Sequence, residues 1–438
     1  MSTDSDKKIL LQELKGGDIY ALMSASEELR GDKQVMLQAV KLREFEDALT
    51  YTSAELRQNR EVVLAAVKTN GNALQYASEE LQADKQLVLR AVMNNGLALQ
   101  FASKALQADK QVVFQAAKIN AEALKYADKA LLSDKEILLE AIRKNGGWAF
   151  EYAHEDLRND KKFVMQVIDV DQSHLAFEFA SEALRADKEV VLHAVKSSGV
   201  TLEHASQEWQ SNKEIALAAV KSSGFALKFV SPDLQNDKEI VSAAIQDTGH
   251  ALEFAHETWR SDKTLVLKTV KDWGRVLEFV HETLRGDKEI VSAAVKQNPI
   301  ALEYASEALR NDPELIFEVV KSFPPTFEYA SEALRNNKDF VLKAVNICGN
   351  TLEFASATLQ DDSEVALEAI KNNGDALEFV SERLKADKTL VLEAVKNSAG
   401  CFQFASEALR TDREIISEAL RREPMVKMFL SQELQNTL

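Results

Sequence analysis

Hydrophobic residues recur along the chain in a block that repeats about every 25 residues. In each block a polar pair, often Asp-Lys, precedes a stretch in which nearly every position is apolar, as in residues 190–195. A helix that is apolar over so wide an arc must be covered on more than one side. Stacked helices provide this cover, because each has a neighbour before and after it. The pattern therefore predicts a tandem helical repeat.

The polar pair sets the period of the repeat. Its first residue recurs every 25 residues from Asp187 to Asp412 and every 25 to 27 residues before that. The copies begin at Asp6, Asp32, Asn59, Asp84, Asp109, Asp134, Asp160, Asp187, Asn212, Asp237, Asp262, Asp287, Asp312, Asn337, Asp362, Asp387 and Asp412. An Asp or Asn side chain accepts hydrogen bonds from the first turn of a helix, so we expect an N-cap at each copy.

Each copy is expected to hold two helices and a tight turn. The long helix ends near a recurrent glycine such as Gly199, for which we predict the left-handed conformation of helix C-termini. A shorter helix follows, in which Leu252, Phe254 and Ala255 share one face. A Ser-Glu-x-Leu-Arg segment then forms a single capped turn.

The predicted fold is all-α: an α-solenoid (superhelix) of about seventeen 25-residue helix–turn–helix repeats. Residues 1–438 are assigned to a single elongated solenoid domain, because the copies leave no room for a second one. Residues 1–31 and 413–438 are assigned as atypical terminal units. Ser24 stands at the aromatic position of the first unit, and Met428 replaces the usual glutamate of the last.

The recurrent string Ala-Leu-Glu-Phe-Ala-Ser-Glu-Ala-Leu-Arg-x-Asp-Lys-Glu-Val-Val-Leu-x-Ala-Val-Lys resembles a known family. It is similar to the tandem repeats catalogued as domain of unknown function 4116. The resemblance extends over nearly the whole chain, since many copies match independently. It implies an interaction scaffold and carries no assigned activity, so no functional residue is transferred from it.

Composition narrows the choice of partner. The formal net charge of −17 argues against nucleic acid, whose binding depends on an excess of Lys and Arg, and fits a protein partner with a basic surface. The two cysteines, Cys348 and Cys401, are too few for a disulfide framework or a zinc site. We expect no membrane insertion and a cytoplasmic location; non-classical secretion stays open. The sequence does not indicate an oligomeric state.

Few residues of the sequence suggest catalysis or metal binding. The sequence contains no phosphate loop, nucleophile elbow or His-Glu metal motif. His154, His256 and His281 stand where other copies have the capping serine, so we interpret them as caps. The insertion at residues 169–174 lacks the glycine and the final glutamate of a calcium loop and is interpreted as a bulge. We therefore predict a non-enzymatic protein with no catalytic residue, metal site or cofactor.

Acidic residues form the clearest surface pattern. A glutamate precedes the aromatic residue in six consecutive copies, which we call the acidic row: Glu253, Glu278, Glu303, Glu328, Glu353 and Glu378. A second glutamate often follows four residues later, as at Glu257, where we expect it on the same helix face. The row has two interpretations: a solvated outer face, or a docking ridge for a basic partner.

Lysine and aromatic residues add smaller signals. Lysine at the first helical turn opposes the helix dipole, so we hypothesise that each lysine pairs with a glutamate of the same or the adjacent copy. These lysines are Lys188, Lys213, Lys238, Lys263 and Lys288. Trp148 and Trp273 lie near the glycine turns, as core residues or as exposed hot spots. The segment from Phe323 to Pro325 is a rigid turn or an exposed apolar contact.

The sequence thus supports two functions. The first is a non-enzymatic protein–protein interaction scaffold that binds its partner along the extended acidic surface. The alternative is a structural subunit or rigid spacer within a larger assembly. In that case the chain ends, including Met425 and Met428, would make the contacts.

Overall fold

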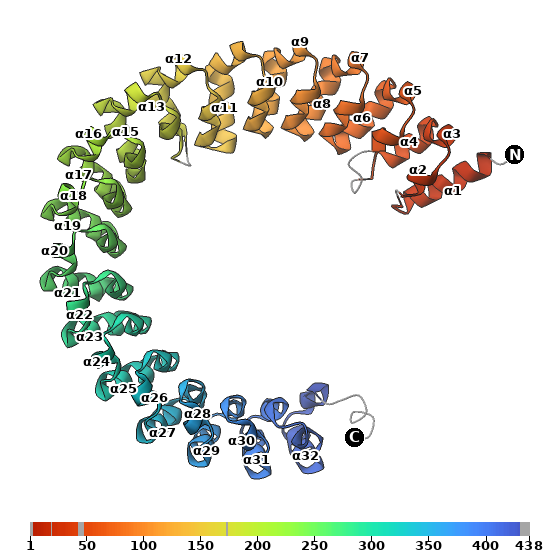
Figure 1. Cartoon of the computed structure of the whole chain (residues 1–438). Helices are drawn as coiled ribbons and strands as arrows, with labels where there is room; N and C mark the ends of the chain where they lie inside the picture. The colour runs from red at the N-terminus through yellow and green to blue at the C-terminus, as the bar shows by residue number, and fades with distance from the viewer. Residues whose placement is uncertain (1–2, 19, 43–47, 172–173, 430–438) are drawn as a thin grey trace. The chain divides into compact units, whose positions relative to one another are not determined.

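The structure is a computed structural model that describes residues 3–18, 20–42, 48–171 and 174–429. Every regular element within these ranges is a helix. The chain divides into two compact units, residues 1–234 and 235–438. In each unit the helices of successive repeats lie side by side in chain order (Figure 1). The prediction of an all-α solenoid of short repeats is confirmed.

Each repeat contains three helical pieces. A typical copy has the long helix α15 (Lys188–Ser197), the 3₁₀-helix η8 (Gly199–His204) and the single turn α16 (Gln207–Gln210). The predicted second helix is therefore a 3₁₀-helix. Ala205 and Ser206 separate it from the capped turn, because both have extended backbone (ψ 157° and 153°).

The elements of the first unit follow this order. Its longer helices are α1 (Thr3–Lys15), α2 (Tyr20–Ser24), α4 (Lys33–Ala39), α6 (Arg60–Thr69), α8 (Lys85–Asn94), α10 (Lys110–Ile119), α11 (Lys135–Asn145), α13 (Lys161–Val170), α15 and α17 (Lys213–Ser222). Its 3₁₀-helices are η1 (Ala48–Tyr51), η2 (Gly71–Tyr76), η3 (Gly96–Phe101), η4 (Ala121–Tyr126), η6 (Gly147–Tyr152), η7 (Ala176–Phe179), η8 and η9 (Gly224–Phe229). Its short turns are α3 (Glu27–Arg30), α5 (Ala54–Arg57), α7 (Glu79–Gln82), α9 (Lys104–Gln107), η5 (Lys129–Ser133), α12 (Glu155–Arg158), α14 (Glu182–Arg185) and α16, and α18 (Pro232–Gln235) lies at the division.

The second unit repeats the same order. Its long helices are α19 (Lys238–Asp247), α21 (Lys263–Asp272), α23 (Lys288–Gln297), α25 (Pro313–Ser322), α27 (Lys338–Ile347), α29 (Ser363–Asn372), α31 (Lys388–Asn397) and α32 (Arg413–Arg422). Its 3₁₀-helices are η10 (Gly249–Phe254), η11 (Gly274–Phe279), η12 (Pro299–Tyr304), η13 (Pro324–Tyr329), η14 (Gly349–Phe354), η15 (Gly374–Phe379), η16 (Ala399–Phe404) and η18 (Pro424–Phe429). Its short turns are α20 (Glu257–Arg260), α22 (Glu282–Arg285), α24 (Glu307–Arg310), α26 (Glu332–Arg335), α28 (Ala357–Gln360), α30 (Glu382–Lys385) and η17 (Leu409–Thr411).

The predicted N-caps begin the long helices. The Asp187 carboxylate accepts hydrogen bonds from the backbone N–H groups of Glu189 (3.0 Å) and Val190 (3.1 Å). These bonds satisfy donors that have no partner inside the helix. Asp6 is the exception, because it lies inside α1 and does not begin that helix.

The prediction for the recurrent glycine is wrong at most copies. Among the described glycines only Gly17 and Gly146 have a positive φ, so Gly199 is not left-handed. Instead, a Cβ atom on Gly199 would lie 2.1 Å from the carbonyl oxygen of Ala219 in the next repeat. At Gly199 the lack of a side chain therefore permits a close approach of two backbones, whereas Ala121 and Ala399 occupy the same position in other copies.

The core is built from the same positions in each copy. In α15 the side chains of Val190, Val191, Ala194 and Val195 are fully buried, and so is Leu202 of η8. Burial of one such Val or Leu side chain contributes about 1.5–3 kcal/mol relative to exposure. Because successive repeats pack against one another within each unit, this core continues from copy to copy inside the unit.

The insertion and the C-terminal repeat depart from the common pattern. Asp171 is buried, and its carboxylate accepts a hydrogen bond from the backbone N–H of Ala176 at 2.6 Å. The interpretation as a bulge agrees with this capping role, while residues 172–173 lie outside the described part. Near the C-terminus, Met425 and Met428 of η18 are 62% and 72% exposed. Residues 430–438 also lie outside it, and the two atypical terminal units remain predictions.

Candidate functional site

Ion pairs join consecutive repeats at the start of many long helices. Lys263 Nζ lies 2.7 Å from Asp287 Oδ2 and 3.0 Å from Glu289 Oε2, both in the next copy. We call the set of such pairs the ion-pair ladder. It contains Lys7–Asp32, Arg60–Asp84, Lys85–Asp109, Lys110–Asp134, Lys135–Asp160, Lys161–Asp187, Lys263–Asp287, Lys288–Asp312, Lys338–Asp362 and Lys388–Asp412.

The ladder explains why lysine is placed at an unfavourable end of the helix. Its main partner is the N-cap aspartate of the next copy, so the hypothesis of lysine–glutamate pairing is correct only in part. Lys188 does pair with a glutamate, Glu214, at 2.7 Å. The hydrogen bond from Lys263 holds the pKa of Asp287 below its usual value. These charges are therefore committed to contacts between repeats.

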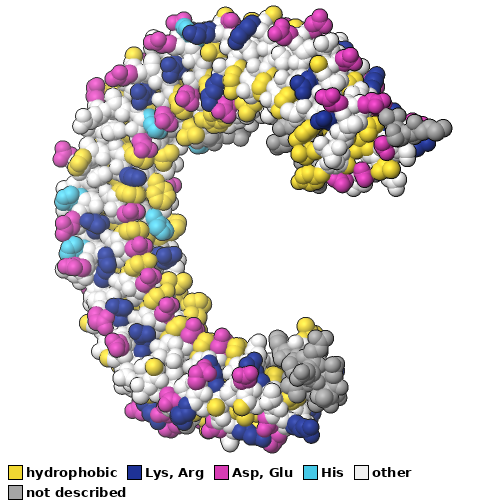
Figure 2. All heavy atoms as spheres, turned by 45° about the vertical axis from the view of Figure 1, so that its right-hand side comes forward, with side chains coloured by type: hydrophobic (Ala, Val, Ile, Leu, Met, Phe, Trp, Pro, Cys, Tyr) yellow, Lys and Arg dark blue, Asp and Glu magenta, His cyan; other side chains and the backbone are white. Residues whose placement is uncertain are grey.

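The acidic row lies on a different element, the 3₁₀-helices η10 to η15. Five of its six glutamates are exposed and Glu278 is half-buried. Consecutive 3₁₀-helices pack against one another through the second unit, so the row is continuous there. In the space-filling view, carboxylate and hydrophobic side chains are interspersed on the exposed surface (Figure 2). None of the six row carboxylates forms an ion pair with a described residue.

The electric field of the row reaches neighbouring side chains. Burial raises the pKa of Tyr329, and the charges of Glu303 and Glu328 raise it further. Arg275 donates a hydrogen bond to the hydroxyl of Tyr304 at 3.3 Å. This bond raises the pKa of Arg275, and the charges of the nearby row glutamates add to it. Tyrosine hydroxyls and carboxylates are thus near neighbours along the row.

The second series of glutamates does not share a face with the acidic row. Glu257 belongs to the separate turn α20, and Ala255 and His256 between it and Glu253 are extended. The four-residue spacing rule applies within one helix, so the prediction of a common face is wrong. Two members of this series are paired locally: Glu307 with Arg310 at 2.6 Å and Glu382 with Lys385 at 2.9 Å.

Three histidines cap short turns, as the sequence indicated. The Nδ1 atoms of His154, His256 and His281 accept hydrogen bonds from backbone N–H groups two residues later at 3.3, 3.2 and 3.4 Å. Each replaces a serine that caps the same turn in other copies, such as Ser331. These histidines are therefore explained by the fold.

Two exposed aromatic residues occupy a position that is usually polar. Trp273 and Phe323 are the N-cap residues of η11 and η13, and neither makes a capping hydrogen bond. Their exposed fractions are 40% and 42%, so neither side chain is fully buried in the core, and a role in binding stays a prediction. Trp148, by contrast, is half-buried and in edge contact with Tyr152.

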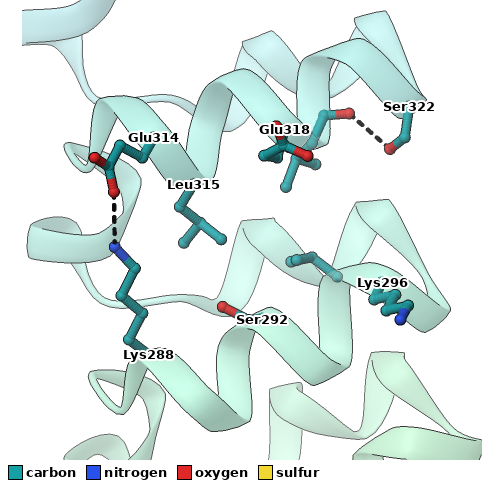
Figure 3. Close-up of a pocket in the computed structure, with 9 residues that line it drawn as sticks. Lys288, Ser292, Lys296, Glu314, Leu315, Glu318 and Ser322 are labelled. Carbon is teal, nitrogen blue, oxygen red and sulfur yellow. Dashed lines mark hydrogen bonds and ion pairs between the residues drawn. The ribbon is translucent and has the colours of Figure 1, made fainter.

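A cavity of about 580 Å³ lies between α23 and α25 (Figure 3). Val295, Leu315 and Val319 give it apolar walls. At one end Lys288 Nζ lies 3.7 Å from Glu314 Oε2, while Lys296 and Ser322 lie toward the other. The repeat pattern does not predict this cavity.

The cavity is a feature of the repeat, because the equivalent residues Leu192, Lys196 and Glu214 line a cavity of about 500 Å³ beside α15 and α17. Ser292 lines the cavity between α23 and α25 and replaces the leucine found at the same position in Leu342 and Leu392. The two serines of this cavity lack an adjacent histidine among the lining residues, and Ser322 Oγ donates to the carbonyl of Val319 at 2.9 Å. The arrangement suits an apolar side chain and does not form a nucleophile with its base.

The described ranges give little support for metal binding, membrane insertion or thiol chemistry. They hold no group of three or more His, Cys, Asp or Glu side chains placed to bind a metal ion. None of their helices combines the length and the hydrophobicity that a bilayer crossing requires. Cys401 is buried, and burial raises the pKa of its thiol to about 12.

The repeat can now be compared with known proteins. The family model described as Domain of unknown function (DUF4116) matches residues 32–82, 59–107, 109–158, 134–185, 160–210, 212–260, 262–310, 312–360, 362–410 and 387–435. A comparison with curated proteins gives no match. The matched segments overlap and follow the repeats observed in the structure. The chain therefore belongs to the DUF4116 family, as the resemblance of its repeat indicated.

Proposed function

We propose that the chain is a non-enzymatic interaction scaffold that binds a protein partner with a basic surface along the acidic row. One observation carries the proposal. The carboxylates of the ion-pair ladder are paired between repeats, whereas the exposed carboxylates of the acidic row have no ion-pair partner among the described residues. The row therefore offers charge that the fold itself does not use.

The spacing of the row suits a partner of opposite charge. Stacked helices lie roughly 8–10 Å apart, so we expect a similar spacing between successive carboxylates. The Debye length is about 8 Å at physiological ionic strength, so each charge is partly screened from the next. A partner with lysines at a matching interval can contact several carboxylates at once. Such complementarity mainly raises the rate of association and makes binding sensitive to salt.

A pair of matched charge reversals tests the proposal. The first variant carries Glu278→Lys, Glu303→Lys and Glu328→Lys in the second unit. The control carries Glu151→Lys, Glu178→Lys and Glu203→Lys, which change the net charge equally at the same repeat position of the first unit. Binding of a fluorescent oligolysine peptide is measured by anisotropy at low and physiological salt.

We expect the second-unit variant to lose about tenfold or more in affinity and most of its salt dependence, with a smaller effect in the control, because only the second unit has an unbroken row. Equal effects of the two variants would show that the peptide senses only net charge. The row would then be a solvated face.

The structure also favours a second candidate, a rigid spacer that contacts other subunits through its end. Met425 and Met428 are the most exposed methionines of η18, and exposed apolar residues often mark interfaces. Replacing both by serine should then disrupt assembly, while the charge reversals in the row should not. Native-source capture followed by sizing of the complex separates the two candidates.

A further inference from the structure

Two repeats of the second unit carry an exposed aromatic residue at the N-cap of their 3₁₀-helix, where most copies carry a polar residue. At the N-cap of η12 and η15, Asn298 and Asn373 each accept a hydrogen bond from a backbone N–H at 3.1 Å. Trp273 and Phe323 at the equivalent positions cannot accept such a bond, and each leaves a large apolar surface in contact with solvent. Neither residue is therefore explained by helix capping.

The Trp273 side chain and the backbone that follows Phe323 are both restricted. The Trp273 ring lies so close to Gly249 that a Cβ atom there would be 2.5 Å from its Cγ. The ring also makes an edge contact with His250, with centroids 6.0 Å apart. Phe323 is followed by Pro324 and Pro325, whose rings fix the backbone φ at the start of η13. Rigid aromatic groups lose little conformational entropy when a partner binds.

The two aromatic residues bracket the centre of the acidic row. Trp273 begins the 3₁₀-helix that carries Glu278, and Phe323 begins the one that carries Glu328. The 3₁₀-helix between them, η12, carries Glu303 and packs against both. Two exposed aromatic residues and three row glutamates therefore belong to three elements that pack side by side.

We propose that Trp273 and Phe323 are two anchor points for one peptide segment of the partner, a basic segment with two bulky apolar side chains. The proposal rests on the proposed function, because the acidic row selects the charge of the segment. The anchors add the apolar contacts that typically dominate binding energy at interfaces. A purely basic chain would leave both anchors uncovered.

The geometry predicts the length of the segment. The anchors are two repeats apart, or about 16–20 Å at the usual spacing of stacked helices. An extended chain advances about 3.3 Å per residue, so its two apolar side chains should be about five or six residues apart. The lysines or arginines between them face Glu278, Glu303 and Glu328.

Two synthetic peptides test this prediction on the full-length chain. The first has two leucines six positions apart with lysines between them, and the second has serine in place of both leucines. Their charges are equal, so any difference in affinity measures the apolar anchors. We expect the leucine peptide to bind about tenfold or more tightly, given the energy of burying two apolar side chains.

Variants that restore the missing cap make the test independent of folding. Trp273→Asn and Phe323→Asn introduce the residue found at Asn298 and Asn373, whose capping bond offsets part of the packing lost with each ring, so both variants should keep a cooperative thermal transition. Each should reduce the preference for the leucine peptide, and together they should abolish it. Cys348→Asn is the matched control, because it changes another N-cap without a side-chain bond but removes no exposed aromatic residue.

The outcomes separate the inference from the proposed function. If the two peptides bind equally to the unaltered chain, or if the asparagine variants keep the preference, the anchors are refuted. If both peptides still depend on the acidic row in that case, the proposed function stands. If neither peptide responds to charge reversal in the row, both proposals fail.

Discussion

The two units use one repeat but differ at a single exposed position of the 3₁₀-helix. In the second unit this position is glutamate in six consecutive copies. In the first unit the equivalent residues are Gln75, Gln100, Lys125, Glu151, Glu178, Glu203 and Lys228. The acidic series of the first unit is therefore shorter and ends at a lysine.

The contacts that hold successive repeats together are of the same kind in both units. Both units have N-cap aspartates, the ion-pair ladder and a glycine that admits the backbone of the next repeat. The fold therefore tolerates glutamate, glutamine or lysine at the position of the row. An unbroken row in one unit is a property of that unit's surface, and this is the reason to look there for binding.

The largest expected effect tests whether the two units have equivalent cores. Leu252 and Leu202 are both fully buried at the same position of the repeat. Leu252→Ala should cost about 2–5 kcal/mol, because it removes transfer energy and leaves a cavity. Leu202→Ala in the first unit should cost a similar amount. Chemical denaturation followed by circular dichroism gives both values, and a loss below about 1 kcal/mol at either site would mean that this leucine is not part of a packed core.

A smaller effect is expected at the glycine that follows the long helix. The Cβ atom of Gly349→Ala would lie 2.3 Å from the carbonyl oxygen of Ala369, so the next repeat must move. We expect a loss of about 1–3 kcal/mol, typical of an overpacked core, and a similar loss for Gly199→Ala in the first unit. Gly400→Ala is the control, because nothing lies within 4 Å of its Cβ position. Thermal denaturation measures all three losses, and a loss at Gly349→Ala no larger than that at Gly400→Ala would show that the close approach does not matter.

These glycines show which features of the fold can be predicted from the sequence and which cannot. The period, the N-caps and the buried apolar positions followed from spacing, because helix caps and core faces have local signatures. The reason for Gly199 could not be found from spacing, because a Cβ atom at this position would clash with the backbone of Ala219, 20 residues away. The partner of Lys263 and the cavity at Ser292 likewise depend on contacts between repeats. The acidic row was visible in the sequence, but its lack of ion-pair partners needed side-chain positions.

The N-cap aspartates should make both units sensitive to acid. Pairing with Lys263 lowers the pKa of Asp287 in the folded chain, so its contribution to stability is present above the unfolded value of about 4. That contribution is lost as the pH falls through the lowered pKa. Asp287→Ala should cost about 1 kcal/mol near neutral pH through the lost cap. Asp187→Ala should behave alike in the first unit.

Denaturation at several pH values checks this prediction. The gap in stability between Asp287→Ala and the unaltered chain should narrow below about pH 4, where the carboxylate becomes protonated. Asp287→Asn keeps the cap and removes only the charge, so it should lie between the two. A gap that does not change with pH would mean that the cap matters and the ladder does not.

The smallest expected effect concerns the acidic row itself. Glu303→Gln together with Glu328→Gln removes two charges that raise the pKa of Tyr329, so this pKa should fall, although burial keeps it above the usual value. Ultraviolet titration of the phenolate, with Tyr329→Phe to assign the signal, measures the change. Glu253→Gln is the matched control, because it removes a row charge that does not contribute to Tyr329. Stability should change by less than about 0.5 kcal/mol, as is usual for exposed charges. If neutralising these glutamates lowers the pKa of Tyr329 and leaves stability unchanged, the acidic row is not needed for folding and is free to bind a partner. A large loss of stability would instead mean that the row stabilises the repeat, and the contrast between the two units would disappear.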